Sequence, residues 1–193
     1  LLGRFATLQL LGLGIGDSEY VQAWEYALDA APATVLVLDL DGDGEDEIVV
    51  GTRDGRVHSL SVDRTIRWLN APGEEIAFLA RARYALSEPP RVAVVRRQRP
   101  LDESAPDTRQ RLSWLELREA TGERLWATIL NQEVTSLVVD DRNADSPAII
   151  LGTSAGQVLA YDFAGNALWS HTLPGLEGGV HHLIIDDRLG ELP

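Results

Sequence analysis

Apolar and polar residues alternate over short stretches along most of this chain, and turns rich in glycine, aspartate or proline separate the stretches. Alternation with a period of two predicts β-strands that are buried on at least one face. No stretch shows the period of a long helix, so the pattern predicts an all-β fold. The expected strands lie at residues 5–13, 21–28, 34–39, 47–51, 56–62, 65–70, 76–83, 91–97, 111–118, 123–130, 134–140, 148–152, 157–163, 166–172 and 180–186.

The predicted strands repeat in groups of four. Four of the five Trp residues each come before an apolar strand, at intervals of roughly 40 to 60 residues, near the length of a four-stranded propeller blade. These residues are Trp24, Trp68, Trp126 and Trp169. In addition, segments 35–69 and 136–170 align without a gap. We therefore predict a β-propeller of four-stranded antiparallel blades, with about 3.5 to 4 blades present.

The groups of strands also predict how the chain is divided. We expect a single propeller segment over residues 1–193, with a partial blade at 1–30, full blades at 34–70, 76–130 and 134–173, and the start of a next blade at 180–193. Both ends then fall within a blade and leave open strand edges. We expect the chain to be part of a larger propeller that is completed by more chain or by another subunit. A polar loop at 98–110 is either a binding insertion or a tolerated extension.

Composition narrows the classes of function. The formal net charge is −13, which argues against nucleic acid and against anionic membrane surfaces as partners. No apolar run is long enough for a transmembrane helix. The absence of cysteine excludes disulfides, thiolate metal sites and a cysteine nucleophile. Every basic residue is arginine, a bias that indicates a GC-rich bacterial genome.

An acidic loop between the strands at 34–39 and 47–51 carries the clearest chemistry. Asp39, Asp41 and Asp43 alternate, Gly44 follows, and Glu47 closes the run. Alternate carboxylates in a tight loop can supply the six to eight oxygens that Ca²⁺ prefers. Strands flank the loop, so it is not an EF-hand. The competing interpretation is a solvated acidic turn without a metal.

The arrangement strand, D-x-D-x-D-G-x-x-E loop, strand resembles the FG-GAP repeat of integrin-α type, in which such a loop joins the first two strands of a propeller blade. The resemblance implies a Ca²⁺ site with side-chain ligands Asp39, Asp41, Asp43 and Glu47, and with the backbone carbonyl of Glu45. Segments 115–126 and 157–169 also resemble the ends of quinoprotein-like repeats. That second resemblance implies that the Trp residues pack between blades.

The acidic pattern is lost in the later repeats. In the gap-free alignment, Arg142 takes the place of Asp41, Ala144 that of Asp43, and Ala148 that of Glu47. We therefore expect one Ca²⁺ site, and we expect Arg142 to pair with Asp140 or Asp141.

The sequence favours a non-catalytic, calcium-binding propeller that serves as a scaffold for protein–protein interaction. The G-x-S-x-G match at 152–156 lies between two predicted strands, whereas a nucleophile elbow needs a strand-to-helix turn. The alternatives are an enzyme domain of quinoprotein-like or polysaccharide-acting type, and a structural module that binds no metal. An extracellular or cell-surface location is favoured, because millimolar Ca²⁺ suits a weak site.

Overall fold

The structure is a computed structural model that describes residues 6–13, 20–84, 88–99, 111–143, 145–175 and 178–186. All regular secondary structure in these residues is β-strand. The strands are β1 (Ala6–Leu13), β2 (Tyr20–Leu28), β3 (Pro32–Leu38), β4 (Glu47–Thr52), β5 (Val57–Leu60), β6 (Ile66–Leu69), β7 (Glu75–Ala82), β8 (Arg91–Arg97), β9 (Ser113–Arg118), β10 (Arg124–Leu130), β11 (Val134–Asp140), β12 (Ala148–Thr153), β13 (Gln157–Asp162) and β14 (Ala167–Thr172). No helix in the described residues is long and apolar enough to cross a membrane.

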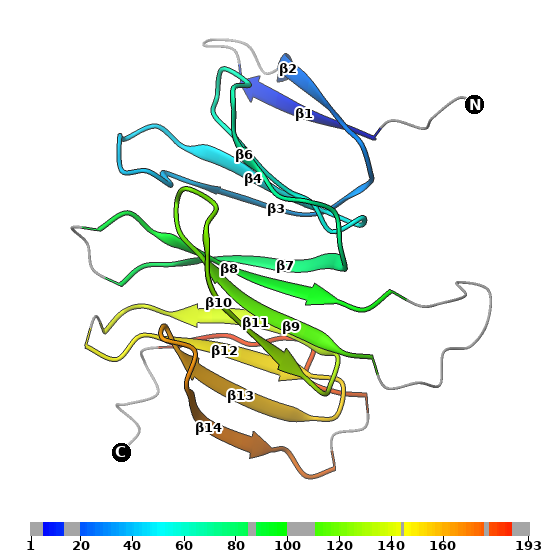
Figure 1. The fold of residues 1–193 in the computed structure, drawn as a ribbon, viewed down its shortest axis with the longest axis vertical. Helices are drawn as coiled ribbons and strands as arrows, with labels where there is room; N and C mark the ends of the chain where they lie inside the picture. Colours follow the sequence, from blue (N-terminus) through cyan, green and yellow to red (C-terminus); the bar gives the residue numbers. More distant parts are fainter. Residues whose placement is uncertain are drawn as a thin grey trace.

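Three sheets of four strands follow one another along the chain. We call them sheet I (β3–β6), sheet II (β7–β10) and sheet III (β11–β14); in each, neighbours in sequence pair antiparallel. A two-stranded sheet, β1–β2, precedes them. Figure 1 shows the sheets stacked along the long axis of the molecule, from blue to orange. The prediction of an all-β fold with four-stranded antiparallel blades is confirmed.

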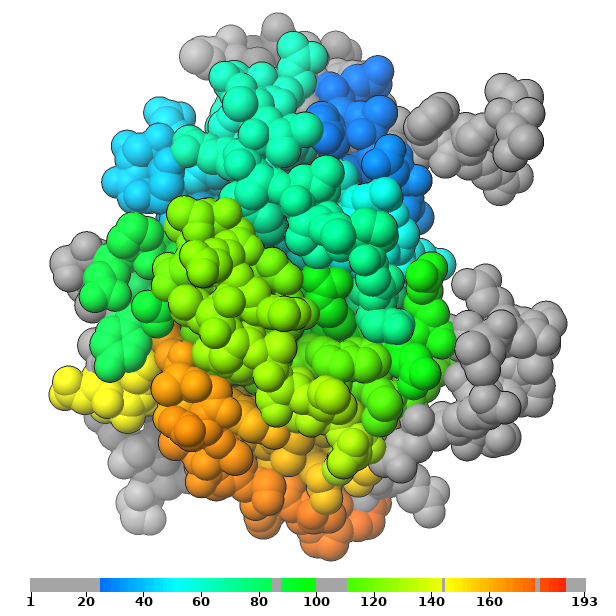
Figure 2. All heavy atoms as spheres, in the orientation of Figure 1, coloured from blue at the N-terminus to red at the C-terminus, as the bar shows by residue number. Residues whose placement is uncertain are grey.

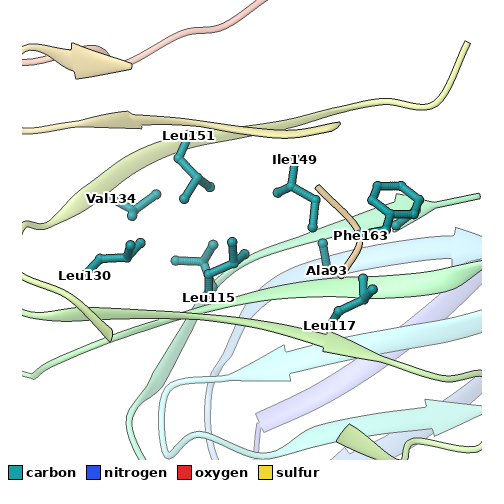
Figure 3. Packing of buried hydrophobic residues seen from close by; sticks show 10 residues of the cluster. Ala93, Leu115, Leu117, Leu130, Val134, Ile149, Leu151 and Phe163 are labelled. Carbon is teal, nitrogen blue, oxygen red and sulfur yellow. The ribbon is translucent and has the colours of Figure 1, made fainter. Parts of the chain in front are cut away.

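The sheets pack face to face through apolar layers. The core between sheets I and II includes Leu38, Val49 and Val94. The core between sheets II and III includes Leu115 and Ile149, and Figure 3 shows these side chains meeting between the two sheets. Sheet II, in the middle, therefore has two apolar faces, as expected for a sheet that is covered on both sides. Figure 2 shows the outer hairpins of sheets I, II and III side by side on one face.

Two tryptophans join one sheet to the next in the same way. Trp68 Nε1 donates a hydrogen bond to the Ala120 carbonyl at 2.8 Å, and its ring covers Gly122. Trp126 Nε1 donates to the Phe163 carbonyl at 2.9 Å, and its ring covers Gly165. The expectation that these Trp residues pack between blades is met at both positions.

The strand predicted at 180–186 is not formed. These residues have no strand partner among the described residues, and without a hydrogen-bonded neighbour an extended segment is not a strand. Val180 nevertheless lies against Gly152, as Ile76, in the inner strand β7, lies against Gly51. The segment thus starts in the position of the next inner strand.

The gap-free alignment of sheets I and III is wrong by one residue at their first strands. β3 pairs Leu38 with Glu47, whereas β11 pairs Asp140 with Ala148. The β11–β12 loop is therefore one residue shorter than the β3–β4 loop. As a result Asp141, and not Asp140, takes the place of Asp39. Sequence spacing could not show this difference, because the deletion falls in a loop.

Two other predictions remain open. Most of the polar loop at 98–110 lies outside the described residues, as do all of residues 187–193. The division of residues 1–193 into blades of one larger propeller stays a prediction.

Replacing Gly122 with alanine is expected to destabilise the joint between sheets I and II. Gly122 has φ +83°, and a Cβ there would lie 2.5 Å from the Trp68 ring. Gly175 has φ +76° with open space around it, so Gly175→Ala isolates the backbone strain. We expect Gly122→Ala to lower the free energy of unfolding in urea by about 2–4 kcal/mol, and Gly175→Ala by about 1 kcal/mol. Equal losses would show that the Trp68 contact contributes nothing.

Candidate metal centre

The acidic loop between β3 and β4 is held in shape by its first aspartate. Asp39 Oδ1 accepts a hydrogen bond from the Gly42 N–H at 2.7 Å, and Oδ2 accepts one from the Gly44 N–H at 3.1 Å. Both glycines have positive φ, +83° and +92°, a conformation that glycine adopts without a steric penalty. The sequence D-x-D-G-D-G thus folds the loop locally around the Asp39 carboxylate.

Three predicted ligands converge within this loop. Asp39, Asp41 and Asp43 each offer a carboxylate oxygen, and these oxygens lie within 4.8 Å of one another. Oxygens bound to one Ca²⁺ at 2.3–2.6 Å are separated by no more than about 5 Å. This is the one such acidic group found among the described residues. The spacing therefore fits a single hard cation.

The fourth predicted ligand, Glu47, lies at the start of β4 beneath the loop and is 1% exposed. Its Oε2 accepts a hydrogen bond from the Leu40 N–H at 2.9 Å, while its Oε1 has no hydrogen-bond partner. Burial raises the pKa of this carboxyl, although the Leu40 N–H and the nearby Arg67 act in the opposite direction. A buried carboxylate oxygen without a hydrogen bond needs a positively charged partner, which can be an arginine or a metal ion.

Arg67, on β6 of the same sheet, brings a positive charge to these carboxylates. Its guanidinium forms an ion pair with Asp41, and its Nη2 lies 3.5 Å from an Asp43 oxygen and 3.1 Å from Glu47 Oε1. The contact with Glu47 is an ion pair without hydrogen-bond geometry. Burial acts to lower the pKa of Arg67, but the attraction of Glu47 and Asp41 outweighs it, and the pKa is raised. Arg67 therefore partly neutralises three of the predicted ligands.

Sequence reasoning did not find Arg67. It lies more than twenty positions from Asp41 and Asp43, and the antiparallel order of β3 to β6 brings it to the loop. An arginine on an outer strand carries no local signal for this role. The spacing of the aspartates alone indicated a metal site. The position of Arg67 beside them is seen only in the folded structure.

A groove of about 500 Å³ opens beside the loop. Solvent can reach the carboxylates through it, so a cation has an entry path. Glu45 is exposed here, and the role of its backbone carbonyl stays a prediction. The groove is lined by Asp43, Glu45, Glu47, Ser61, Val62, Asp63, Thr65 and Arg67.

The corresponding loop of sheet III has a different charge arrangement. Arg142 donates to Asp140 through Nε at 2.9 Å and Nη2 at 3.0 Å, which confirms the predicted pairing. This hydrogen bond lowers the pKa of Asp140. Asp141 accepts a hydrogen bond from the Arg83 N–H at 3.3 Å. An ion pair thus stands where sheet I has its acidic group.

The G-x-S-x-G match lies in the turn between β12 and β13. Ser154 is exposed there, and its N–H donates to the Glu133 carbonyl at 2.9 Å. The motif joins two strands, as predicted, and lacks the strand-to-helix turn of a nucleophile elbow.

Removing the positive charge of Arg67 is expected to destabilise the metal-free protein. In Arg67→Gln, the carboxylates of Asp41, Asp43 and Glu47 lose their counter-charge and repel one another. Arg67 is about one-third exposed, so solvent screens part of this repulsion and we expect only a modest fall in the free energy of unfolding, measured in urea with a chelator. Arg53→Gln, at an exposed position in the β4–β5 turn, is the control. If Arg67→Gln is as stable as the wild type, solvent already screens the repulsion among the loop carboxylates.

Comparison with known proteins places this site in a recognised repeat. Residues 31–60, which include β3, the acidic loop and β4, match the family model of the FG-GAP repeat. The outer membrane protein assembly factor BamB of Nitrosomonas eutropha is 38% identical over 61 residues, which make up 32% of this chain and 14% of that protein.

Two solved structures share the fold. The crystal structure of BamB from Moraxella catarrhalis superposes with a TM-score of 0.53 and 16% identity, and the match covers 78% of this chain and 40% of that one. The structure of BBS1N in complex with ARL6DN gives a TM-score of 0.54 and 19% identity, covering 79% of this chain and 46% of that one. The chain therefore spans less than half the length of these relatives. It has a β-propeller type of fold and carries an FG-GAP repeat at residues 31–60.

Proposed function

We propose that this chain is a calcium-binding propeller module that acts as a non-catalytic scaffold for protein–protein association in a bacterial cell envelope. The observation that carries the metal part is Glu47, a buried carboxylate with one oxygen free of hydrogen bonds beside three converging aspartates. The scaffold part rests on the fold and on the relatives named above.

Side chains of Asp39, Asp41, Asp43 and Glu47, with the Glu45 carbonyl, would hold the Ca²⁺. All these donors are oxygens, the ligands that this hard cation prefers. When bound, the ion would supply the positive charge that Arg67 brings only in part. Arg67 would then have to leave at least Asp41 and Glu47, since a guanidinium and a Ca²⁺ cannot share the same oxygens. Ca²⁺ and Arg67 are thus competing cations for one site.

The names of the relatives support an assembly role. One is an outer membrane protein assembly factor, and another is described in complex with a second protein. We extend this to the present chain as association with protein partners at the cell envelope, which agrees with the extracellular or cell-surface location favoured by the sequence. A propeller of stacked sheets offers a rigid surface for that purpose.

Ca²⁺ is expected to raise the melting temperature of the wild-type chain. A ligand that binds only the folded state stabilises it by about 2.7 kcal/mol at a hundred times its Kd. Asp41→Asn should remove most of this increase, because an amide lacks the charge that attracts the ion. The matched control is Asp145→Asn in the β11–β12 loop, which should keep the full increase. If the wild-type protein melts cooperatively and its melting temperature is the same with Ca²⁺ as with chelator, the calcium proposal is wrong.

Arg67→Gln is expected to bind Ca²⁺ more tightly than the wild type does. The variant no longer has to break the ion pairs of Arg67 with Asp41 and Glu47 before the ion enters. We expect the Kd from calorimetry to fall by about tenfold, which corresponds to 1.4 kcal/mol. Arg53→Gln should leave the Kd unchanged. An equal or weaker affinity in Arg67→Gln would mean that arginine and metal do not compete.

The scaffold role can be tested in cells. A tagged chain should be recovered by cross-linking with outer membrane assembly proteins, and Asp41→Asn should reduce this recovery if calcium shapes the binding surface. Recovery of the chain in free form only, together with a measured turnover of a sugar or alcohol substrate, would instead favour the enzyme alternative.

A further inference from the structure

A second pocket, of about 380 Å³, lies between sheets I and II. The β6–β7 connection at residues 70–74 forms one wall, and strands β8, β9 and β10 form the other. No described residue lines both this pocket and the groove beside the acidic loop. The pocket is therefore a separate site, and both of its walls lie in the middle of the described chain.

Three buried charged side chains line this pocket. Arg96 on β8 is 8% exposed, and Glu116 and Arg118 on β9 are 3% and 7% exposed. Arg96 Nε donates to Glu116 Oε1 at 2.7 Å, and Arg118 donates to Glu116 Oε2 through Nε at 3.0 Å and Nη2 at 2.7 Å. Both oxygens of the one carboxylate are thus engaged by arginine. The three groups together keep one positive charge.

The packing of the sheets does not require charges at these positions. By strand register, Leu159 and Tyr161 of sheet III take the places of Glu116 and Arg118 of sheet II. Leu159 and Tyr161 pack against the core between sheets II and III. Burying ionised groups costs free energy that their mutual attraction repays only in part, and apolar replacements are often as stable. The charged cluster beside a pocket therefore points to a ligand.

Two hydrogen-bond donors at the pocket are open. Among the described residues, no acceptor is found for Arg96 Nη2 or for Trp114 Nε1. Arg96 and Trp114 lie directly opposite each other in the β8–β9 pair, so their side chains stand on the same face of sheet II. Trp114 is the one Trp outside the repeated spacing, and its partly buried ring adds an apolar surface beside the two donors.

A third guanidinium stands at the same pocket. Arg124, on β10, has its Nη1 3.8 Å from Glu116 Oε1, and its side chain is 57% exposed. The lining holds three arginines and two glutamates, which leaves a net charge of +1 in a chain whose formal net charge is −13. A local excess of positive charge attracts anions. One singly charged anion would neutralise this lining.

We propose that this pocket binds a carboxylate that is attached to a flat or apolar group. The carboxylate would accept hydrogen bonds from Arg96 Nη2, Trp114 Nε1 and the Arg124 guanidinium, and the attached group would lie against the Trp114 ring. A planar carboxylate matches the planar fork of arginine, and its single negative charge balances the lining. The site needs no Ca²⁺ and goes beyond the function proposed above.

The indole N–H signals in ¹⁵N NMR spectra of the chain test this site directly. Five Trp residues give five such signals, and the Trp114 signal is the one that is missing in Trp114→Phe. With a chelator present, phenylacetate should shift the Trp114 signal saturably, whereas the neutral analogue phenylacetamide should not. No saturable shift with any carboxylate, or an equal shift with phenylacetamide, overturns the proposal.

A capped Glu–Phe dipeptide distinguishes two sources of the carboxylate. If the dipeptide shifts the Trp114 signal at lower concentrations than phenylacetate does, the ligand is an acidic segment of a protein. If the dipeptide shifts it less or not at all, while phenylacetate does so saturably, the ligand is a small organic acid.

Arg124→Gln tests the part played by the third guanidinium. We expect the Kd of phenylacetate to rise about tenfold, which corresponds to 1.4 kcal/mol. Arg124 is chosen because most of its side chain is exposed, so the variant keeps the buried cluster, and its remaining NMR signals report that it is folded. Arg53→Gln removes the same charge from an exposed position in the β4–β5 turn and should leave the Kd unchanged. An unchanged Kd in Arg124→Gln contradicts the proposed contact.

Discussion

The stack of sheets depends on one repeated contact, a tryptophan laid over a glycine of the next sheet. The indole nitrogen donates to a carbonyl of the facing turn, so the buried polar group is satisfied while the ring fills the gap between sheets. Only glycine fits beneath the ring at Gly122 and Gly165, where the backbone also has positive φ. The contact fixes the position of the outer strands, and the apolar inner strands then pack in register.

The acidic loop gains its geometry from the same stacking. Its two flanking strands, β3 and β4, are held by the core between sheets I and II, and Glu47 is buried where that core ends. β6, which carries Trp68 for the joint, also carries Arg67 for the loop. Neighbouring residues of a strand point to opposite faces, so one strand serves both purposes at once. Strand β6 therefore belongs both to the candidate metal site and to the joint between sheets I and II.

Much of the fold could be predicted from the sequence, because alternation of apolar residues marks strands and the Trp spacing marks the repeat. The convergence of Asp39, Asp41 and Asp43 was likewise predictable from their spacing. The role of Arg67 was not, since it depends on which strand lies beside the loop. The one-residue slip of β11 and the unpaired state of 180–186 were also missed. Both depend on hydrogen-bonded partners, which local pattern cannot identify.

The two hydrogen bonds that Asp39 accepts from its own loop affect how fast the proposed ion could bind there. Because Asp39 and Glu47 already hold the backbone without a metal, entry of the proposed Ca²⁺ would require the Arg67 side chain to move aside, but would not require the loop to fold. Side chains of partly exposed residues reorient in picoseconds to nanoseconds, far faster than a loop folds. Folding of the loop would therefore not limit the rate at which the proposed ion binds.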